Sequence, residues 1–146
     1  MGMVMLLTGV TSAGPPSAAT DGKPLRRGAA SGTDIQVGFD TPIEDAVCEL
    51  WSTAGSGAMT AAVRLWGFSA EAATWFPIGI TPAAGTDTNR GLLNNGVTIG
   101  EMTTVADKLA FAQVIGGLRV FTRVAAEIVG ALGGVSTAIS VGIRNL

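Results

Sequence analysis

The sequence contains no histidine and no tyrosine, and it has a single cysteine, Cys48, among 146 residues. These absences exclude a zinc site built on imidazole ligands and a serine or cysteine nucleophile that is activated by histidine. One cysteine cannot form a disulfide within the chain, and a lone cysteine is most often a small buried hydrophobe. We therefore predict that the protein is not an enzyme and that it uses no cofactor.

The remaining residues that could carry chemistry do not form a recognisable motif. Gly22 and Lys23 are followed by Pro24, where a phosphate-binding loop needs serine or threonine. We interpret the acidic group at residues 44–49 as solvated surface charge beside a turn. The segment Asp87–Asn89 lacks the full ligand pattern of a calcium loop. The sequence predicts no metal site.

Charge is also scarce, because charged residues make up 14% of the chain and the net charge is −2. Soluble domains usually carry about 25% charged residues. A nucleic-acid partner is not expected without a basic surface, and a polybasic membrane patch is not expected with only two lysines. The low charge fits a surface covered in an assembly, and it fits equally a surface of serine, threonine and alanine.

The apolar residues, 47% of the chain, include few aromatic ones, which make up 5%. Small side chains bury little area each, so the core is expected to be thin and to gain stability from oligomerisation or a partner. The apolar start, Met1–Leu7, is short and lacks a basic region, and we predict no secretion signal. The segment Val124–Ile143 is the one membrane candidate, but Glu127 and several glycines argue against a span.

The first 33 residues differ in composition from the rest. Residues 8–33 are dominated by Thr, Ser, Ala, Gly and Pro, which oppose regular helix and sheet. They also hold a basic cluster. We predict an extended N-terminal arm over residues 1–33, followed by a folded domain over residues 34–146. Two interpretations of the arm stay open: a flexible linker, or a segment that orders on a neighbouring subunit.

From residue 34 onward, short apolar segments alternate with turns. Apolar and polar residues alternate with the period of a half-buried strand in several of them. Pro77 places one of these strands at a sheet edge or bulge. Residues 81–96 are expected to form a long surface loop. The strand candidates are Asp34–Phe39, Met59–Phe68, Thr74–Ile80, Val97–Met102, Lys108–Ile115 and Val135–Ile143.

Two segments fit either a helix or a strand. Residues 42–52 begin with a capping-box pattern, but they alternate, and the following Gly55–Gly57 turn favours a hairpin into the next segment. Residues 119–131 show helical spacing, but they precede a Gly133–Gly134 turn and the clearest strand in the chain. We interpret both as strands, the second as the hairpin partner of that final strand. Many short strands separated by turns predict an all-β, antiparallel sandwich.

The large aromatic side chains gather around one loop. We predict that they pack in the core or between subunits, and a sugar-stacking platform is the alternative. Aromatic pairs across strands stabilise a hairpin by ~0.2–1 kcal/mol each. The predicted packing set is Trp51, Trp66, Phe68, Trp75 and Phe76.

The run Met59-Thr-Ala-Ala-Val-Arg-Leu-Trp-Gly-Phe, followed by Thr74-Trp-Phe-Pro-Ile-Gly, resembles a hairpin of small virion proteins of tailed bacteriophages. A terminal hairpin like Arg123–Leu132 and Val135–Ile143 accompanies it in those chains. The resemblance covers roughly residues 34–146 and is greatest to capsid decoration, or cement, proteins. Phe68 stands where an aromatic residue with a hydroxyl group is common.

This resemblance implies a jelly-roll-like β-sandwich, a homotrimer, and a place on the outer capsid surface of a virion. The major capsid protein would be the partner, and the arm would reach over neighbouring capsid subunits. The residues implied for that capsid contact are Lys23, Pro24, Leu25, Arg26 and Arg27. The alternatives are a tail, neck or fibre-attachment module of a phage, a carbohydrate-binding β-domain, and a small membrane protein.

Overall fold

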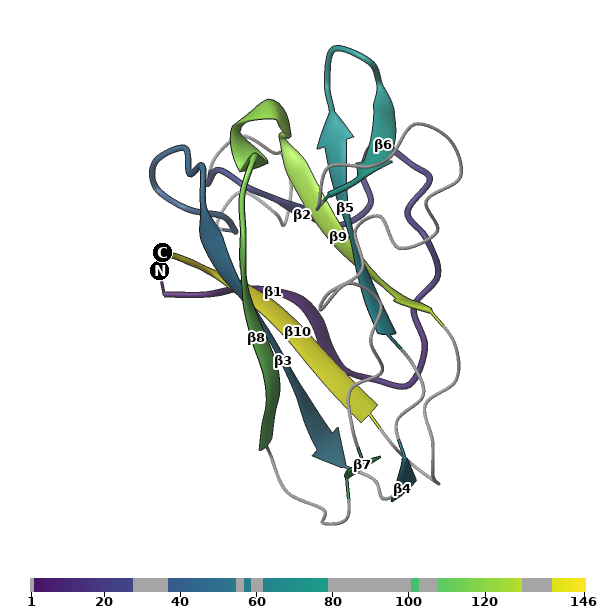
Figure 1. Ribbon diagram of the computed structural model, residues 1–146. Coiled ribbons are helices and arrows are strands. Elements are labelled where there is room, and N and C mark those ends of the chain that lie inside the picture. Colours follow the sequence, from purple (N-terminus) through teal and green to yellow (C-terminus); the bar gives the residue numbers. More distant parts are fainter. Residues whose placement is uncertain are drawn as a thin grey trace, which may run out of the picture.

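The computed structural model describes residues 2–27, 37–54, 57–58, 62–78, 101–102, 108–129 and 138–146. In these ranges the chain forms two four-stranded sheets with antiparallel pairing (Figure 1). The predicted segments 34–36, 59–61 and 81–100, with the Asp87–Asn89 calcium candidate, lie outside the described residues.

Sheet A has the order β1-β10-β3-β8 and sheet B the order β2-β9-β5-β6. A short ladder joins β4 to β7, and a 3-10 turn, η3, precedes β9. The strands of sheet A are β1 (Val4–Val10), β10 (Ala138–Asn145), β3 (Ala46–Ala54) and β8 (Lys108–Ile115). The strands of sheet B are β2 (Lys23–Pro24), β9 (Arg123–Val129), β5 (Ala62–Ser69) and β6 (Thr74–Pro77). The remaining elements are β4 (Gly57–Ala58), β7 (Glu101–Met102) and η3 (Leu118–Val120).

One hydrophobic cluster joins the two sheets. Sheet A and sheet B each turn the apolar side chains of alternate positions toward it, as the period of a strand requires. The fold is therefore β-sandwich-like, and the predicted alternation is confirmed for the described part of the 59–68 segment. In the 135–143 segment the alternate residues Ile139, Val141 and Ile143 belong to the core cluster, but the residues between them are buried as well. The cluster includes Cys48, Leu50, Ile139, Val141 and Ile143 from sheet A and Val63, Leu65, Val124 and Ala126 from sheet B.

Both ambiguous segments contain strands, β3 and β9. β3 lies between β10 and β8, so its backbone is paired on both sides. The capping-box pattern before it offers only a local helix start, and two sheet neighbours outweigh it. The residues of the membrane candidate that the structure describes lie in β9 and β10. Over the described ranges, no helix has the length and apolarity to cross a membrane.

Two of the predicted hairpins are wrong. β3 lies in sheet A and β5 in sheet B, so the Gly55–Gly57 turn does not lead to its hairpin partner. Likewise, β9 lies in sheet B and β10 in sheet A. Alternation in a sequence shows which face of a strand is buried, but it does not identify the neighbouring strand. The 130–137 connection lies outside the described residues.

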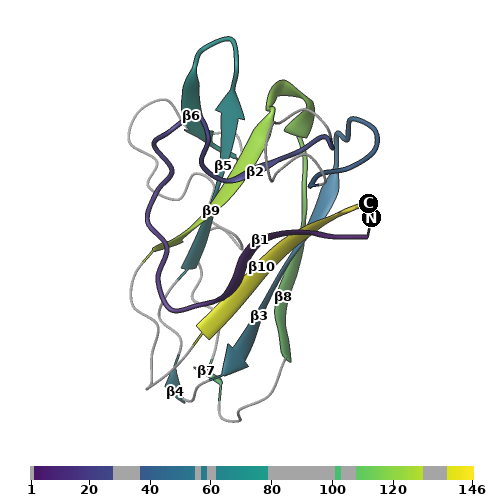
Figure 2. The same ribbon diagram turned by 180° about the vertical axis from the view of Figure 1, so that it is seen from behind.

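The predicted arm is not separate from the sheets in its described part. β1 pairs antiparallel with β10, and β2 pairs antiparallel with β9 (Figure 2). The side chains of Pro24 and Leu25 are buried. A boundary after residue 33 is therefore wrong for residues 4–25, because the sheets supply backbone partners that the composition of this segment does not reveal.

The predictions for Pro77 and for Lys108–Ile115 are confirmed. β6, which contains Pro77, is an edge strand of sheet B. Lys108–Ile115 is the strand β8 at one edge of sheet A. The two chain ends lie side by side in both ribbon views (Figures 1 and 2), where β1 runs beside β10.

Candidate functional site

Residues 13–22, which we call the N-terminal strap, are bound to sheet B through their backbone. The backbone N–H of Ile128 donates to the carbonyl oxygen of Ala13 at 2.9 Å. The Arg123 guanidinium donates to three successive carbonyl oxygens, at 3.0 Å for residue 20, 2.8 Å for residue 21 and 3.0 Å for residue 22. A glycine- and proline-rich segment is thus positioned by one planar fork of donors.

A carboxylate organises the middle of the strap. Asp21 Oδ2 accepts hydrogen bonds from the backbone N–H groups of Ser17 at 2.9 Å and Ala18 at 2.8 Å. These two bonds lower the pKa of the Asp21 carboxyl group, since they favour its charged form, and the nearby Arg123 cation lowers it further. At neutral pH this side chain is therefore an ionised brace inside the loop.

The aromatic residues of the β5–β6 hairpin divide between internal packing and the surface. Phe68 and Trp75 pack with their ring centroids 5.2 Å apart and tilted by 55°, together with Ala125 and the partly buried Trp66. Trp75 Nε1 donates to the carbonyl oxygen of Ala18 at 3.0 Å. Phe76 is exposed. These contacts place Phe68 and Trp75 inside the chain.

Trp66 and Trp51 lie in different surroundings. Trp66 Nε1 donates to Glu127 Oε1 at 3.0 Å, and Arg64 Nη1 lies 3.6 Å from that same oxygen. Trp51 lies on β3, in the other sheet, and is half-buried. Three members of the predicted packing set, Trp66, Phe68 and Trp75, thus form one cluster, and Trp51 and Phe76 lie outside it.

The residues expected to contact a capsid have different environments. Lys23 is half-buried in β2, and the next two residues, Pro24 and Leu25, are buried. Arg27 Nη1 forms an ion pair with Asp40 Oδ1 at 3.1 Å. Arg26 is exposed. Of the five residues, this arginine is the one that presents a charged group fully to the surface.

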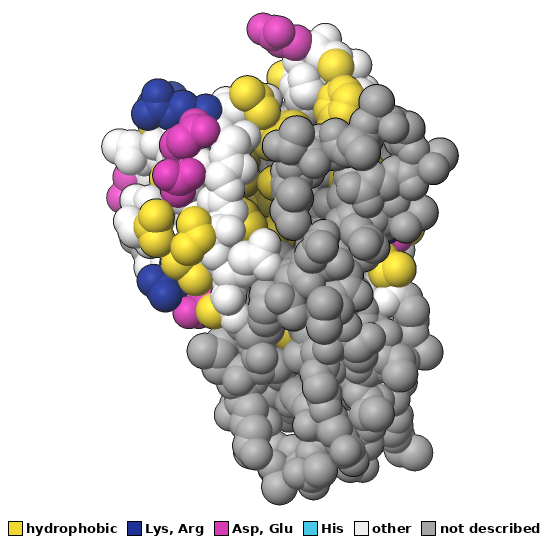
Figure 3. Space-filling model, viewed as in Figure 1, with side chains coloured by type: hydrophobic (Ala, Val, Ile, Leu, Met, Phe, Trp, Pro, Cys, Tyr) yellow, Lys and Arg dark blue, Asp and Glu magenta, His cyan; other side chains and the backbone are white. Residues whose placement is uncertain are grey.

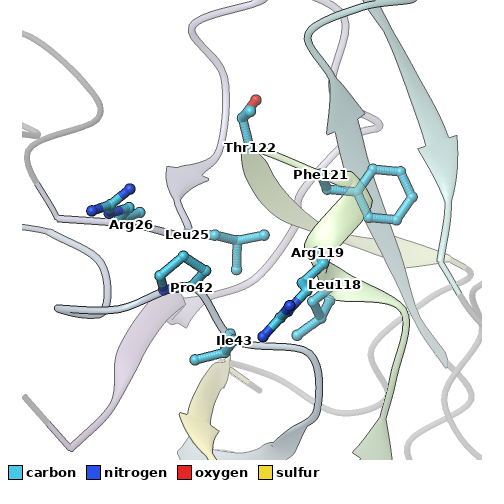
Figure 4. A pocket seen from close by; sticks show the side chains of 8 residues that line it. All are labelled: Leu25, Arg26, Pro42, Ile43, Leu118, Arg119, Phe121 and Thr122. Carbon is cyan, nitrogen blue, oxygen red and sulfur yellow. The ribbon is translucent and has the colours of Figure 1, made fainter.

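Arg26 stands at the edge of a pocket of about 290 Å³ (Figure 4). The pocket lies where the segment after β2, the segment before β3 and the η3 turn meet. Its lining is mainly apolar, and its two charged side chains are both arginines. The lining residues are Leu25, Arg26, Pro42, Ile43, Leu118, Arg119, Phe121 and Thr122.

Backbone hydrogen bonds hold the walls of this pocket in place. Leu25 N–H donates to the Thr122 carbonyl oxygen at 3.0 Å, and Leu118 N–H donates to the Glu44 carbonyl oxygen at 3.1 Å. Phe121 packs on Gly67, where an added Cβ atom would overlap the phenyl ring. The pocket is therefore preformed. Sequence reasoning selected Leu25 and Arg26 but missed the other six lining residues, because they come together only through the pairing of distant strands.

A second surface lies on the outer face of sheet A. Val114 is opposite Val47, and Val47 is opposite Arg144, so the three residues form a row across β8, β3 and β10. Val114 is 57% exposed. Arg144 Nε donates to Glu49 Oε1 at 3.1 Å, which neutralises the acidic residue of the next row. We call the exposed Val114, the buried Val47 opposite it and this ion pair the sheet A patch.

Figure 3 shows hydrophobic side chains gathered on the side of the molecule that carries the two chain ends in Figure 1. Apolar residues from the N-terminal strand extend the outer face of sheet A. An added Cβ atom on Gly142 would lie 2.9 Å from Met3 Cγ and 3.1 Å from Met5 Sδ, so both methionines cover this glycine. Gly142 permits that close cover because it has no side chain.

Other chemistry is limited in the part of the chain that the structure describes. Cys48 is buried, and burial raises the pKa of its thiol to about 12, with the Glu49 charge adding to the shift. No group of three or more cysteine or acidic residues is arranged to hold a metal ion among the described residues.

Comparison of the chain with protein-family models, with curated proteins and with solved structures finds no match. The geometry of the pocket and the sheet A patch, together with the resemblance noted in the sequence, is therefore the basis for a functional proposal.

Proposed function

We propose that this chain is a non-enzymatic structural protein of a tailed-phage virion. In this proposal it is a capsid decoration, or cement, protein that binds the outer capsid surface and stabilises contacts between major capsid subunits. The proposal includes a homotrimeric assembly and a jelly-roll order of the strands. It draws on the hairpin motif around Trp66 and Trp75 and on the sandwich-like arrangement of the two sheets.

The observation that carries the proposal is the sheet A patch. A valine that is 57% exposed lies at the edge strand β8, next to Val47 and an ion pair whose charges neutralise each other. A surface of this kind suits protein contact, because its two charges are already paired with each other and leave no net charge to be desolvated when it is covered. Many such weak contacts add up when an assembly presents several copies at once.

The outer face of sheet A is the proposed contact between copies of the chain. In this proposal the capsid binds at the pocket and Arg26. Pro24 is buried, and Leu25, which is also buried, faces a partner only through the pocket that it lines. The capsid contact is thus moved from a free arm to a preformed surface.

A binding experiment with phage capsids tests this function. Purified chain is mixed with capsids that lack decoration, the capsids are sedimented, and their thermal disruption is followed by calorimetry. We expect saturable, stoichiometric binding and a higher disruption temperature. Binding to purified tails but not to capsids would reassign the chain to a tail or neck position, and binding to neither would overturn the proposal.

The subunit contact is tested with Val114→Asp, because a charge on this exposed residue does not disturb the core. Val120→Asp is the matched control, since Val120 is also exposed, at 70%, but lies in η3. Analytical ultracentrifugation should show a trimer for the unaltered chain and the control and a smaller species for Val114→Asp. Equal sedimentation of all three proteins would contradict the assigned contact.

A further inference from the structure

The pocket between the segment after β2, the segment before β3 and η3 has a floor that belongs to the main core. Leu25, Ile43 and Leu118 line it, and each is a buried member of the hydrophobic cluster that joins the two sheets. The volume of about 290 Å³ lies just below the range of roughly 300–1,000 Å³ that is usual for ligand pockets. It suits one apolar side chain better than a large cofactor.

The charged rim of this pocket has one sign. Arg26 and Arg119 come from different segments and lie on different sides of Leu25 in Figure 4. No carboxylate side chain is among the lining residues. An apolar ligand with negative charge beside it therefore complements both the floor and the rim.

The ion pair that Glu44 forms with Arg119 at this rim is weak. Arg119 Nε lies 3.8 Å from Glu44 Oε2, and both side chains are half exposed or more, at 67% and 50%. Exposed pairs with such a separation contribute little, so a ligand carboxylate can replace Glu44 at small cost. In the described part of the chain, no ion pair to Arg26 is present.

We propose that this pocket binds an extended segment of a partner protein that presents one leucine-sized side chain between two acidic residues. The apolar side chain enters the pocket, and the flanking carboxylates lie on Arg26 and Arg119. This inference deepens the proposed function by naming the chemistry of the capsid segment, but its test needs no capsid. The capsid sedimentation experiment therefore tests the proposed function, and the peptide titration tests the pocket assignment separately.

The probe is a synthetic heptapeptide with blocked ends, a central leucine, a glutamate two residues away on each side, and glycine elsewhere. Binding to the full chain is followed by NMR titration, which reports both affinity and location. We expect shifts at residues 25–26, 42–43 and 118–122. Replacing the leucine by alanine should weaken binding about tenfold or more, because most of the buried apolar surface is lost. Replacing both glutamates by glutamine should also weaken it.

Variants of the chain test the charged rim. Arg26→Gln and Arg119→Gln should each weaken binding about twofold to fivefold, as expected for an exposed charge pair. Arg64→Gln, which removes an arginine of sheet B that pairs with Glu127 and does not line the pocket, is the matched control and should leave the affinity unchanged. Glu44→Gln should strengthen binding up to about fivefold, because it removes the competing carboxylate. If Glu44 had only a structural role, its replacement would not raise the affinity for the peptide.

Three results would overturn the assignment: titration shifts that lie away from the pocket, equal affinity of the glutamate and glutamine peptides, or equal affinity of Arg26→Gln, Arg119→Gln and Arg64→Gln. Folding of each variant is checked by its own NMR spectrum. Because Arg26 and Arg119 are exposed and Arg64 lies outside the hydrophobic core, a dispersed spectrum is expected throughout, and a loss of affinity can then be assigned to the lost charge.

Discussion

The indole Nε1 of Trp75 donates a hydrogen bond to the backbone carbonyl oxygen of Ala18, a residue 57 positions earlier in the chain, at 3.0 Å. This bond joins the edge strand of sheet B to the N-terminal strap. The strap is rich in small residues and has little apolar surface of its own, so donors from sheet B hold it in place. Its stability should therefore respond to single donors that lie far away in the sequence.

Replacing Trp75 with phenylalanine removes this donor and keeps a ring against Phe68. We expect the free energy of unfolding to fall by about 1–2 kcal/mol, from the lost hydrogen bond and the smaller ring. Amide hydrogen exchange in residues 14–22 should become faster, as measured by NMR. Phe76→Leu is the control, because Phe76 is exposed and makes no described bond to the strap. Unchanged exchange in the strap would show that this bond does not fix it.

Arg123→Lys keeps the positive charge but loses the planar fork that reaches three strap carbonyls. A lysine ammonium cannot match this geometry, so we expect a loss of about 1–3 kcal/mol in the free energy of unfolding. Limited proteolysis should cut the strap faster than in the unaltered chain. Arg119→Lys, at a side chain that is 67% exposed, should be cut at the normal rate. Equal rates for the two variants would contradict the anchoring role.

The Asp21 brace predicts a dependence on pH. Its carboxyl pKa is lowered below the usual 3.8 in the folded chain by the Ser17 and Ala18 N–H groups. A lowered folded pKa means that the stabilising contribution is complete above the usual value and is lost as the pH falls through the folded pKa. We expect strap amide exchange, corrected for its intrinsic pH dependence, to rise only under strongly acidic conditions. Asp21→Asn should abolish that transition, and its persistence would assign the transition to another group.

The sequence was sufficient to predict strand positions wherever alternation marks a buried face. Val63 and Leu65 in β5, and Ile139 and Val141 in β10, are buried as the pattern predicts. Alternation is a local property that the sequence displays directly. The aromatic pair of Phe68 and Trp75 was also predictable, since a short loop separates two strands that then pair across it.

The neighbours of each strand and the pocket were not predictable in this way. β1 joins β10, although the two strands lie at opposite ends of the chain. The pocket combines Leu25, Ile43 and Leu118, which adjoin one another only after both sheets have formed. Since no local pattern records these long-range pairings, the N-terminal segment was mistaken for an arm and two hairpins were assigned wrongly.

Gly67 provides a test of the packing behind the pocket. An added Cβ atom here would overlap the ring of Phe121, so Gly67→Ala should cost about 1–3 kcal/mol in the free energy of unfolding. Phe121→Leu gives the methyl group room, and the double variant should recover part of this loss in a thermodynamic cycle measured by urea denaturation. Strictly additive effects would show that the two residues are not in contact.

Cys48 reports on opening of the whole core. Its thiol is buried between the sheets and its pKa is raised to about 12, so both access and ionisation oppose alkylation in the folded chain. We expect iodoacetamide at pH 8 to react very slowly with the native protein and rapidly in urea. If the core opens only by global unfolding, a variant that destabilises the chain, such as Gly67→Ala, should raise the native reaction rate in proportion to its unfolded fraction. A rate that stays constant across such variants would instead reveal local opening around β3. Mass spectrometry of the chain at successive times measures the alkylated fraction and hence the rate.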